Sequence, residues 1–328
     1  MRMLHHVSAF VPISLLFSLS FLTVGSPERV LAQDPDAATT NTARAIEIYR
    51  QGNAKEAIIQ LRAIVKKRPD DADAWYYLGL AFNSQGSIGF SRPAFEQFVK
   101  LRPDSADAHA KLAFALILTN EPQRALVTAQ RALELGDQSA ESHYAIAEAS
   151  LRAGATTKAV EEAETALRIT PSFTPALITR SFAQSDLKLY SEAAASLEQL
   201  LADRPGDLDA ESWRGQMEEL RHQIDPESNP GSPILTAKEV TQKARVTSKP
   251  EPMYSEEARK AGVTGTVVLR GVFSAEGEVK HVMISRALGY GLTTQAIRAA
   301  RKIRFTPAMK DGIPVSMHIQ LEYNFNLY

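Results

Sequence analysis

Residues 66–75 have the sequence "KKRPDDADAW", and a close copy, "KLRPDSADAH", occupies residues 100–109. The two copies are 34 residues apart, and three more divergent copies begin at residues 134, 168 and 202. The same place in each copy holds a proline or, once, an aspartate: Pro69, Pro103, Asp137, Pro171 and Pro205. Repetition at a fixed interval of this size is typical of stacked structural units. The middle of the chain is therefore predicted to be a repeat array.

Each repeat has the side-chain pattern of two closely packed helices. Small residues recur on the lattice at Ala57, Ser91, Ala125, Ala159 and Ala193. Large apolar residues precede them, namely Trp75, Leu78, Phe82, Leu112, Leu116 and Ile146. Small side chains let helices approach closely, and the proline closes each unit because it cannot continue a helix. The pattern resembles the tetratricopeptide repeat. It predicts an α-helical solenoid over residues 38–222, with residues 207–222 as the polar capping helix that such arrays need.

The resemblance also implies which side chains line the inner groove of the array. The family's groove positions fall here on aromatic and aliphatic residues: Tyr49, Tyr76, Leu80, Phe114, Leu118, Tyr144, Leu151, Ile178 and Phe182. Such apolar anchors suit a docked peptide or partner helix. The competing interpretation is that several of them are ordinary core between repeats. The basic residues that clamp a peptide carboxylate in some members of the family are missing at these positions.

No residues in the sequence point to chemistry. His109 and His143 stand one repeat apart, but stacked helices would separate them by about 10–20 Å, which is too far for a shared metal ion. We expect them to be packing residues. The chain has no nucleophile motif, phosphate-binding loop or metal-ligand spacing. The sequence therefore predicts neither an enzyme nor a bound metal or cofactor.

The pattern changes after the array. Residues 223–252 carry prolines, a glycine and polar residues, which predicts a linker that contains a short helix or strand within residues 237–246. In residues 253–328, Ser255 is placed to cap a short helix that ends at Gly262. Residues 265–287 are predicted to form two strands joined by a Gly-containing turn. A second helix is predicted at residues 292–303. Residues 304–315 are predicted to form turns, and a last strand follows them. This order predicts a small α+β domain with a three-stranded antiparallel sheet.

The residues of this last domain resemble the C-terminal domain of TonB. The matching positions are Pro252, Tyr254 and Ala258, then Gly265, Val267 and Leu269, then Gly277, Val279, Ser285, Leu292 and Ala296, and finally "IRFTPA" at 303–308 with Gly312 and Pro314. Two positions depart from the family pattern, since Ser255 replaces a proline and Thr293 stands where an aspartate is common. Both changes are tolerable at a helix start.

The last strand, "VSMHIQLEYNFNLY" at 315–328, alternates strictly between apolar and polar residues. Such alternation predicts one buried and one solvated face. The resemblance implies that this strand lies at the sheet's edge and pairs with an extended segment of an outer-membrane TonB-dependent transporter or another envelope protein. The residues expected to meet the partner are Ser316, His318, Gln320, Glu322 and Asn324. The alternatives are that these polar residues only protect the edge from aggregation, or that the edge pairs two copies into a homodimer.

The N-terminus predicts export. A charged start, an apolar stretch over residues 7–24 and small residues before Gln33 give a signal peptide over residues 1–32 with cleavage after Ala32. The alternative is an uncleaved inner-membrane anchor. Either form places the remaining chain in the periplasm of a Gram-negative envelope. The absence of cysteine excludes disulfides, and the net charge of −1 does not suggest nucleic-acid binding.

Together these features predict a periplasmic adaptor of the TonB family, with the repeats as a protein-binding scaffold. The alternative is a scaffold without energy transfer that binds envelope proteins or peptidoglycan. The sequence leaves open whether an inner-membrane motor complex takes part. TonB-family members that transduce energy carry a histidine within their membrane helix, whereas His5 and His6 precede the apolar stretch here.

Overall fold

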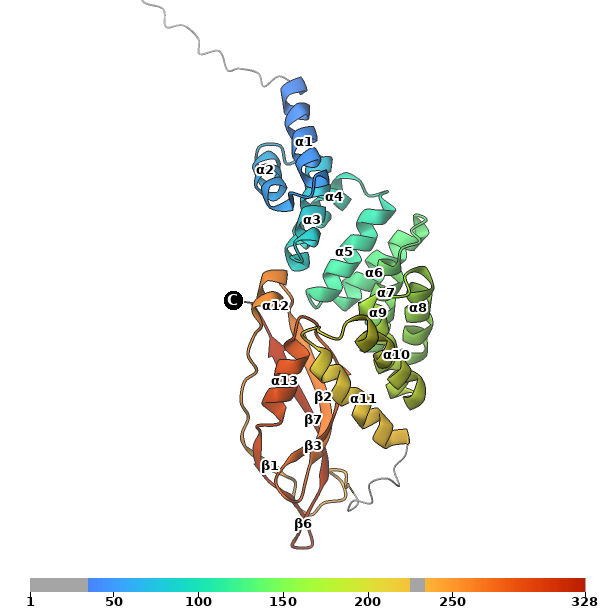
Figure 1. Ribbon diagram of the computed structural model, residues 1–328, viewed down its shortest axis with the longest axis vertical. Helices are drawn as coiled ribbons and strands as arrows, with labels where there is room; N and C mark the ends of the chain where they lie inside the picture. Colours follow the sequence, from blue (N-terminus) through green and yellow to red (C-terminus); the bar gives the residue numbers. More distant parts are fainter. Residues whose placement is uncertain (1–34, 225–233, 328) are drawn as a thin grey trace, which may run out of the picture.

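The computed structural model describes residues 35–224 and 234–327 (Figure 1). The expected signal peptide or anchor, and with it the cleavage site after Ala32, lies outside the described residues. Part of the expected linker, residues 225–233, also lies outside them.

The first part of the described chain is a stack of antiparallel helices, and its odd-numbered members α5, α7 and α9 contact one another along one side. The helices are α1 (Pro35–Arg50), α2 (Ala54–Lys67), α3 (Ala72–Ser84), α4 (Ile88–Leu101), α5 (Ala106–Leu118), α6 (Pro122–Glu134), α7 (Ala140–Arg152), α8 (Thr156–Ile169), α9 (Thr174–Asp186), α10 (Tyr190–Asp203) and α11 (Ala210–Ile224). This solenoid is the predicted fold class.

The repeated sequence explains where the helices begin. Asp71, Ser105 and Ser139 each accept a hydrogen bond from the backbone N–H three residues on, and this bond satisfies a donor that the first turn leaves free. Asp137 replaces the lattice proline in the third copy. Its carboxylate accepts hydrogen bonds from the Ser139 N–H at 3.1 Å and from the Ser139 hydroxyl at 2.6 Å. This side-chain turn takes the place of the proline found in the other copies.

The small lattice residues lie where helices touch, as predicted. Ala57, Ser91, Ala125, Ala159 and Ala193 are all 0% exposed. A larger side chain at any of these positions would force adjacent helices apart, because the interior is close-packed. The 34-residue period is therefore a packing requirement.

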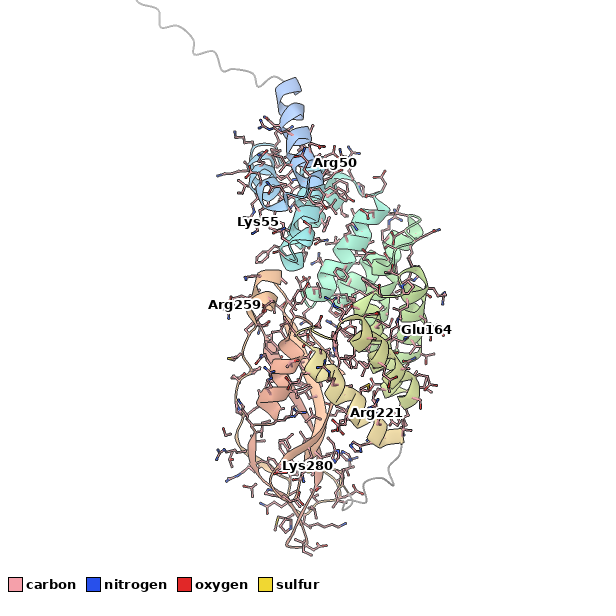
Figure 2. All side chains as sticks on the ribbon, viewed as in Figure 1. Arg50, Lys55, Glu164, Arg221, Arg259 and Lys280 are labelled. Atoms are coloured by element: carbon pink, nitrogen blue, oxygen red, sulfur yellow. The ribbon has the colours of Figure 1, made fainter. Side chains whose placement is uncertain are left out.

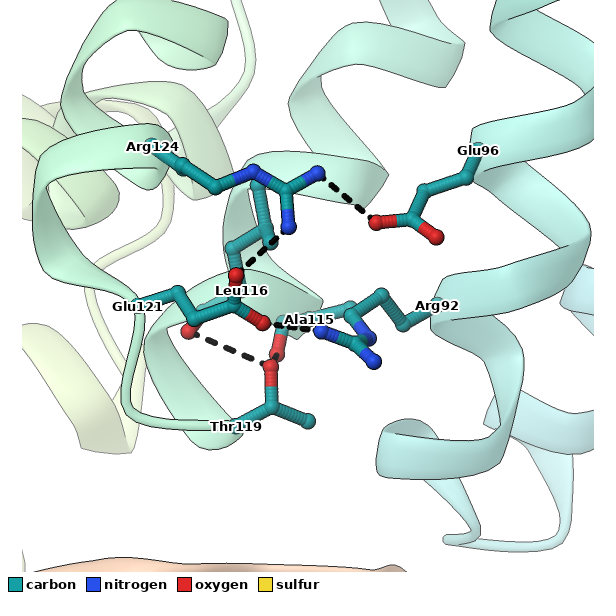
Figure 3. Close-up of polar contacts among 7 residues, drawn as sticks. All are labelled: Arg92, Glu96, Ala115, Leu116, Thr119, Glu121 and Arg124. Carbon is teal, nitrogen blue, oxygen red and sulfur yellow. Dashed lines mark hydrogen bonds and ion pairs between the residues drawn. The ribbon is translucent and has the colours of Figure 1, made fainter.

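Polar contacts connect neighbouring units at the surface of the array (Figure 3). Glu121, just before α6, bonds to Arg92 of α4 and, at 2.5 Å, to Arg124 of α6. Arg124 also reaches Glu96 of α4 at 2.8 Å. Partly exposed pairs of this kind stabilise by at most about 1 kcal/mol each. The main effect of these ion pairs is to fix the orientation of α4 relative to α6, because their contribution to stability is small.

The C-terminal domain contains a three-stranded antiparallel sheet in the order β3-β2-β7, as predicted. Its main elements are α12 (Glu256–Ala261), β2 (Gly265–Phe273), β3 (Val279–Arg286), α13 (Leu292–Ala300) and β7 (Met317–Phe325). Ser255 caps α12 and Gly262, with φ of 68°, ends it. The core gathers Leu269 from β2, Leu292 from α13 and Tyr323 from β7, each 1% exposed or less.

One segment differs from expectation, and the short structured part of the linker is a strand. Residues 304–315, expected to be turns, form the short strands β4 (Arg304–Thr306), β5 (Ala308–Lys310) and β6 (Ile313–Val315), and β5 pairs with β6. The expected linker contains β1 (Arg245–Ser248), which pairs with β4. The stacking of Phe305 on Phe273, with centroids 3.9 Å apart, holds this extra layer against the sheet. The last strand starts at Met317, so Val315 belongs to β6 and the 39% exposed Leu327 lies beyond β7.

The C-terminal domain packs against the helical array from α4 to α11 (Figure 1). At one end the Thr264 N–H donates to the carbonyl of Leu118 at 3.1 Å. Close by, Gly89 of α4 meets the end of α12 so tightly that a Cβ on Gly89 would lie 2.5 Å from the carbonyl oxygen of Gly262. The two parts therefore share an interface with no room for side chains at this point.

We expect Gly89→Ala to weaken this interface. The added methyl group meets backbone atoms, which cannot move aside as a side chain can, so the variant should lose about 1–3 kcal/mol of stability. Gly206→Ala is the matched control, because nothing lies within 4 Å of its added Cβ. Thermal unfolding of both variants checks this expectation. Equal melting temperatures would contradict the close contact between α4 and α12.

Candidate partner-binding site

The two edges of the three-stranded sheet have different surroundings. Helix α11 of the array lies along β3. The Gln216 side chain, 0% exposed, accepts a hydrogen bond from the Ile284 N–H of β3 at 2.7 Å. Glu219 of the same helix contacts His281 of β3 at 3.1 Å. The β3 edge is therefore covered by the chain's own array.

Strand β7 forms the opposite edge. It pairs with β2 along its whole length, from Met317 opposite Phe273 to Phe325 opposite Gly265, without a register shift. Backbone groups of successive residues in a strand point to opposite sides. The Ser316 carbonyl, the His318 N–H and the Glu322 carbonyl all bond to groups outside the sheet. The even-numbered residues of β7 therefore direct their N–H and C=O groups away from β2.

Part of this outer ladder is already occupied. Leu235 forms a parallel bridge with Met317: its N–H donates to the Ser316 carbonyl at 2.9 Å and its carbonyl accepts from the His318 N–H at 3.0 Å. The Lys249 ammonium donates to the Glu322 carbonyl at 2.7 Å. Among the described residues, no backbone partner reaches the outward groups of Gln320 and Asn324 or the N–H of Glu322. Apart from the Glu322 carbonyl, the outward backbone groups from Gln320 to Asn324 are thus open, over about 14 Å at strand spacing.

The five residues expected along this edge do lie there. His318, Gln320, Glu322 and Asn324 are exposed, whereas Ser316 is half-buried and accepts from the Ala275 N–H at 3.2 Å. Sequence reasoning selected them by their position on the last strand. The structure adds that their backbone groups face outward, and that Leu235 covers the first two. No sequence signal marked Leu235 as a strand neighbour.

The nine expected groove residues divide into two groups. Tyr49, Tyr76 and Leu80 lie in the first units. Burial and the hydroxyl's bond to Asp107 raise the pKa of Tyr76. The other six line a cavity of about 690 Å³ whose opposite wall is the C-terminal domain, and they are Phe114, Leu118, Tyr144, Leu151, Ile178 and Phe182. Phe182 even belongs to the same apolar cluster as Leu288 and Val263 of that domain. These six residues therefore face the chain's own C-terminal domain across the cavity.

Asp209 is the main polar anchor of this arrangement, and sequence reasoning missed it. The carboxylate is 2% exposed and accepts from the Gly291 N–H at 2.8 Å and from the Thr294 N–H and hydroxyl at 3.2 Å. These donors belong to the first turn of α13, where a negative charge is favourable. Burial nevertheless raises the pKa of Asp209 to about 6, because the hydrogen bonds offset only part of the desolvation cost.

The two histidines of the array have ordinary partners. The His109 ring lies 3.0 Å from the carbonyl of Pro103, and the His143 ring lies 2.8 Å from Glu162. Over residues 35–224 and 234–327, no cluster of three or more His, Asp or Glu side chains is placed to hold a metal ion. Within the same ranges, no helix combines the length and apolar character needed to cross a bilayer.

Comparison with known protein families agrees with this architecture. Residues 250–327 match the model of the Gram-negative bacterial TonB protein C-terminal domain. Residues 42–89, 91–140 and 119–172 match the tetratricopeptide repeat. The chain joins a tetratricopeptide-repeat array to a TonB C-terminal domain. Both families consist of scaffold or adaptor proteins, so the matches indicate a protein-binding role of the TonB type, and the TonB match points to the Gram-negative envelope.

Individual relatives cover only part of the chain. Protein TonB of Vibrio cholerae serotype O1 is 28% identical over 110 residues, which are 31% of this chain and 45% of that protein. The chain thus spans less than half the length of this curated relative. Among solved structures, MamA is 24% identical with a TM-score of 0.43, covering 52% of this chain and 93% of MamA. The type IV pilus biogenesis factor PilW is 15% identical with a TM-score of 0.46, covering 60% and 97%. At TM-scores below 0.5, these structural similarities add nothing to what the helices themselves show.

The raised pKa of Asp209 predicts how acid affects the chain. A carboxyl whose pKa is higher in the folded than in the unfolded state stabilises folding most when protonated, and this contribution is lost as the pH rises through about 6. Asp209→Asn cannot titrate. On going from pH 7.5 to pH 5, the wild type should gain about 1 kcal/mol of unfolding free energy relative to this variant. Urea unfolding at both pH values measures the difference. A relative gain by the variant at pH 5 would contradict the assignment.

Proposed function

We propose that the chain is an envelope adaptor whose β7 edge accepts an extended segment of an outer-membrane TonB-dependent transporter or another envelope protein. The observation that carries this proposal is the row of outward backbone groups between Gln320 and Asn324. A passing segment can complete the ladder with main-chain hydrogen bonds, and its side chains then decide specificity. The exposed side chains of Gln320 and Glu322 would flank the added strand.

Coverage of the other edge supports this choice. A three-stranded sheet offers two edges for strand addition, and Gln216 together with α11 covers the β3 edge. The array therefore acts as more than a separate scaffold in this proposal. It directs partners to β7 and holds the TonB domain through Asp209 and Gln216, so that a pull on β7 is passed to the helices.

Site-specific disulfide trapping tests the proposal, because the chain has no native cysteine. We would present Gln320→Cys with synthetic segments from the periplasmic N-termini of the source organism's outer-membrane transporters, each carrying one cysteine. Neighbouring strands place Cβ atoms about 4.5–5.5 Å apart, close enough for a disulfide after small adjustment. We expect cross-linking that depends on the position of the cysteine within the segment.

The matched control is Lys280→Cys on β3, an exposed side chain on the covered edge (Figure 2). Equal cross-linking at both sites would show non-specific reaction, and no cross-linking at Gln320→Cys would overturn the proposal. A disulfide-linked dimer of Gln320→Cys in the absence of any segment would assign the edge to self-pairing instead.

The Leu235 bridge predicts that partner length matters. Leu235→Pro removes the N–H that donates to Ser316 and should free the first part of the edge. Segments long enough to reach Ser316 should then bind about fivefold more tightly, since one backbone hydrogen bond contributes about 1 kcal/mol. Segments that span only residues 320–324 should bind as before.

Fluorescence anisotropy with labelled segments of both lengths measures this difference. The control is Lys243→Pro, because the exposed Lys243 donates no backbone hydrogen bond to any described residue. A similar gain with Lys243→Pro, or no gain for long segments with Leu235→Pro, would show that the bridge does not compete with the partner.

A further inference from the structure

The cavity between the array and the TonB domain has the size and position of a ligand site. Its volume of about 690 Å³ falls in the range of about 300–1,000 Å³ found for small-molecule sites, which often lie at domain interfaces. The array contributes an apolar wall that includes Phe114, Ile178 and Phe182. The TonB domain contributes the loop between β3 and α13, with Leu288 and Tyr290.

Two buried aromatic residues on the array wall carry unused hydrogen-bond donors. Tyr144 is 6% exposed and Trp213 is 3% exposed, and both line the cavity. Neither the Tyr144 hydroxyl nor the Trp213 indole N–H bonds to any other described residue, and both atoms keep some accessible surface. Both residues line the same cavity, and their donors remain available to acceptor atoms of a ligand bound there.

Some of the charged side chains that line the cavity have a partner within the chain, and others have none. Glu148 pairs with Arg152 at 2.8 Å, Asp207 pairs with Arg204 at 3.2 Å, and Asp209 is bound by α13. The groups without a side-chain partner among the described residues are Arg286, Lys260 and Glu257. Two free cations against one free carboxylate favour an anionic ligand group.

Contacts between the array and the TonB domain flank the cavity at both ends, and the cavity is partly open to solvent between them. The contact of Gly89 with Gly262 and the bond from Thr264 to Leu118 lie at one end. The bonds from α13 to Asp209 lie at the other. A long peptide running along the array would have to break one of these contacts, whereas a compact ligand fits between them.

We propose that this cavity binds a small amphiphilic anion. Its apolar body packs on Phe114, Ile178 and Phe182, its acceptor atoms meet Tyr144 and Trp213, and its anionic group meets Arg286. This site is separate from the β7 edge and does not depend on the function proposed for that edge.

Trp213 itself can report on binding. The chain has two tryptophans, so Trp75→Phe leaves Trp213 as the only one. In this background we would titrate the full chain with anilinonaphthalene sulfonate, follow energy transfer from Trp213, and displace the dye with dodecanoate. We expect saturable binding of one molecule per chain. Tyr144→Phe should weaken it about fivefold and Arg286→Gln about tenfold, as expected for one neutral and one charged hydrogen bond.

Tyr49→Phe is the matched control, since it removes the same hydroxyl from the other group of groove residues, outside the cavity. It should leave affinity unchanged. The proposal is overturned if energy transfer does not saturate, if dodecanoate fails to displace the dye, or if Tyr144→Phe and Tyr49→Phe behave alike. Circular dichroism of each variant separates these outcomes from misfolding.

Discussion

Helix α11 lies along β3, and the rest of the functional arrangement depends on this contact. Gln216 satisfies the Ile284 N–H at the sheet's edge, and Asp209, just before the same helix, satisfies the first turn of α13. These polar contacts are buried, so losing either partner would leave an unpaired group in a dry interface. They fix the TonB domain on the array and leave β7 as the edge with open backbone groups.

This docking changes what the helical array does. A tetratricopeptide array on its own presents a concave inner surface to partners. Here the TonB domain contacts the array from α4 to α11, and the groove residues of the later units form one wall of the cavity between the two parts. Residues 207–222 were expected to form a capping helix with a polar face. In the structure this helix is α11, and it also buries Trp213 and Gln216. The array and the TonB domain are therefore packed together as one structural unit.

The sequence predicted the separate parts well because their signals are local. The 34-residue lattice requires small residues at helix contacts, and Ala57, Ala125 and their equivalents are fully buried as predicted. Strict alternation in 315–328 likewise predicted the last strand and its buried face, and β7 occupies residues 317–325 of that stretch. The polar residues Ser181 and Gln184 of α9 are also buried. The Ser181 hydroxyl donates to the Ala193 carbonyl, and the Gln184 side chain accepts from the Ser196 hydroxyl.

The interface between the parts could not be predicted in the same way. Asp209 looks like an ordinary helix cap in the sequence, and its bonds to Gly291 and Thr294 join residues more than 80 positions apart. The bridge from Leu235 to β7 has no periodic pattern at all. Such contacts depend on the three-dimensional fit of two finished domains, which no repeat or alternation encodes.

The account's central claim is that β7 is an open edge between Gln320 and Asn324, and amide hydrogen exchange tests it most directly. In the full chain, we predict that the outward N–H groups of Gln320, Glu322 and Asn324 exchange rapidly. The inward N–H groups of Ile319, Leu321 and Tyr323, which pair with β2, should be protected. Residue-resolved exchange by NMR separates the two sets. Equal protection of all six amides would mean that another segment already fills the edge, and would contradict the account.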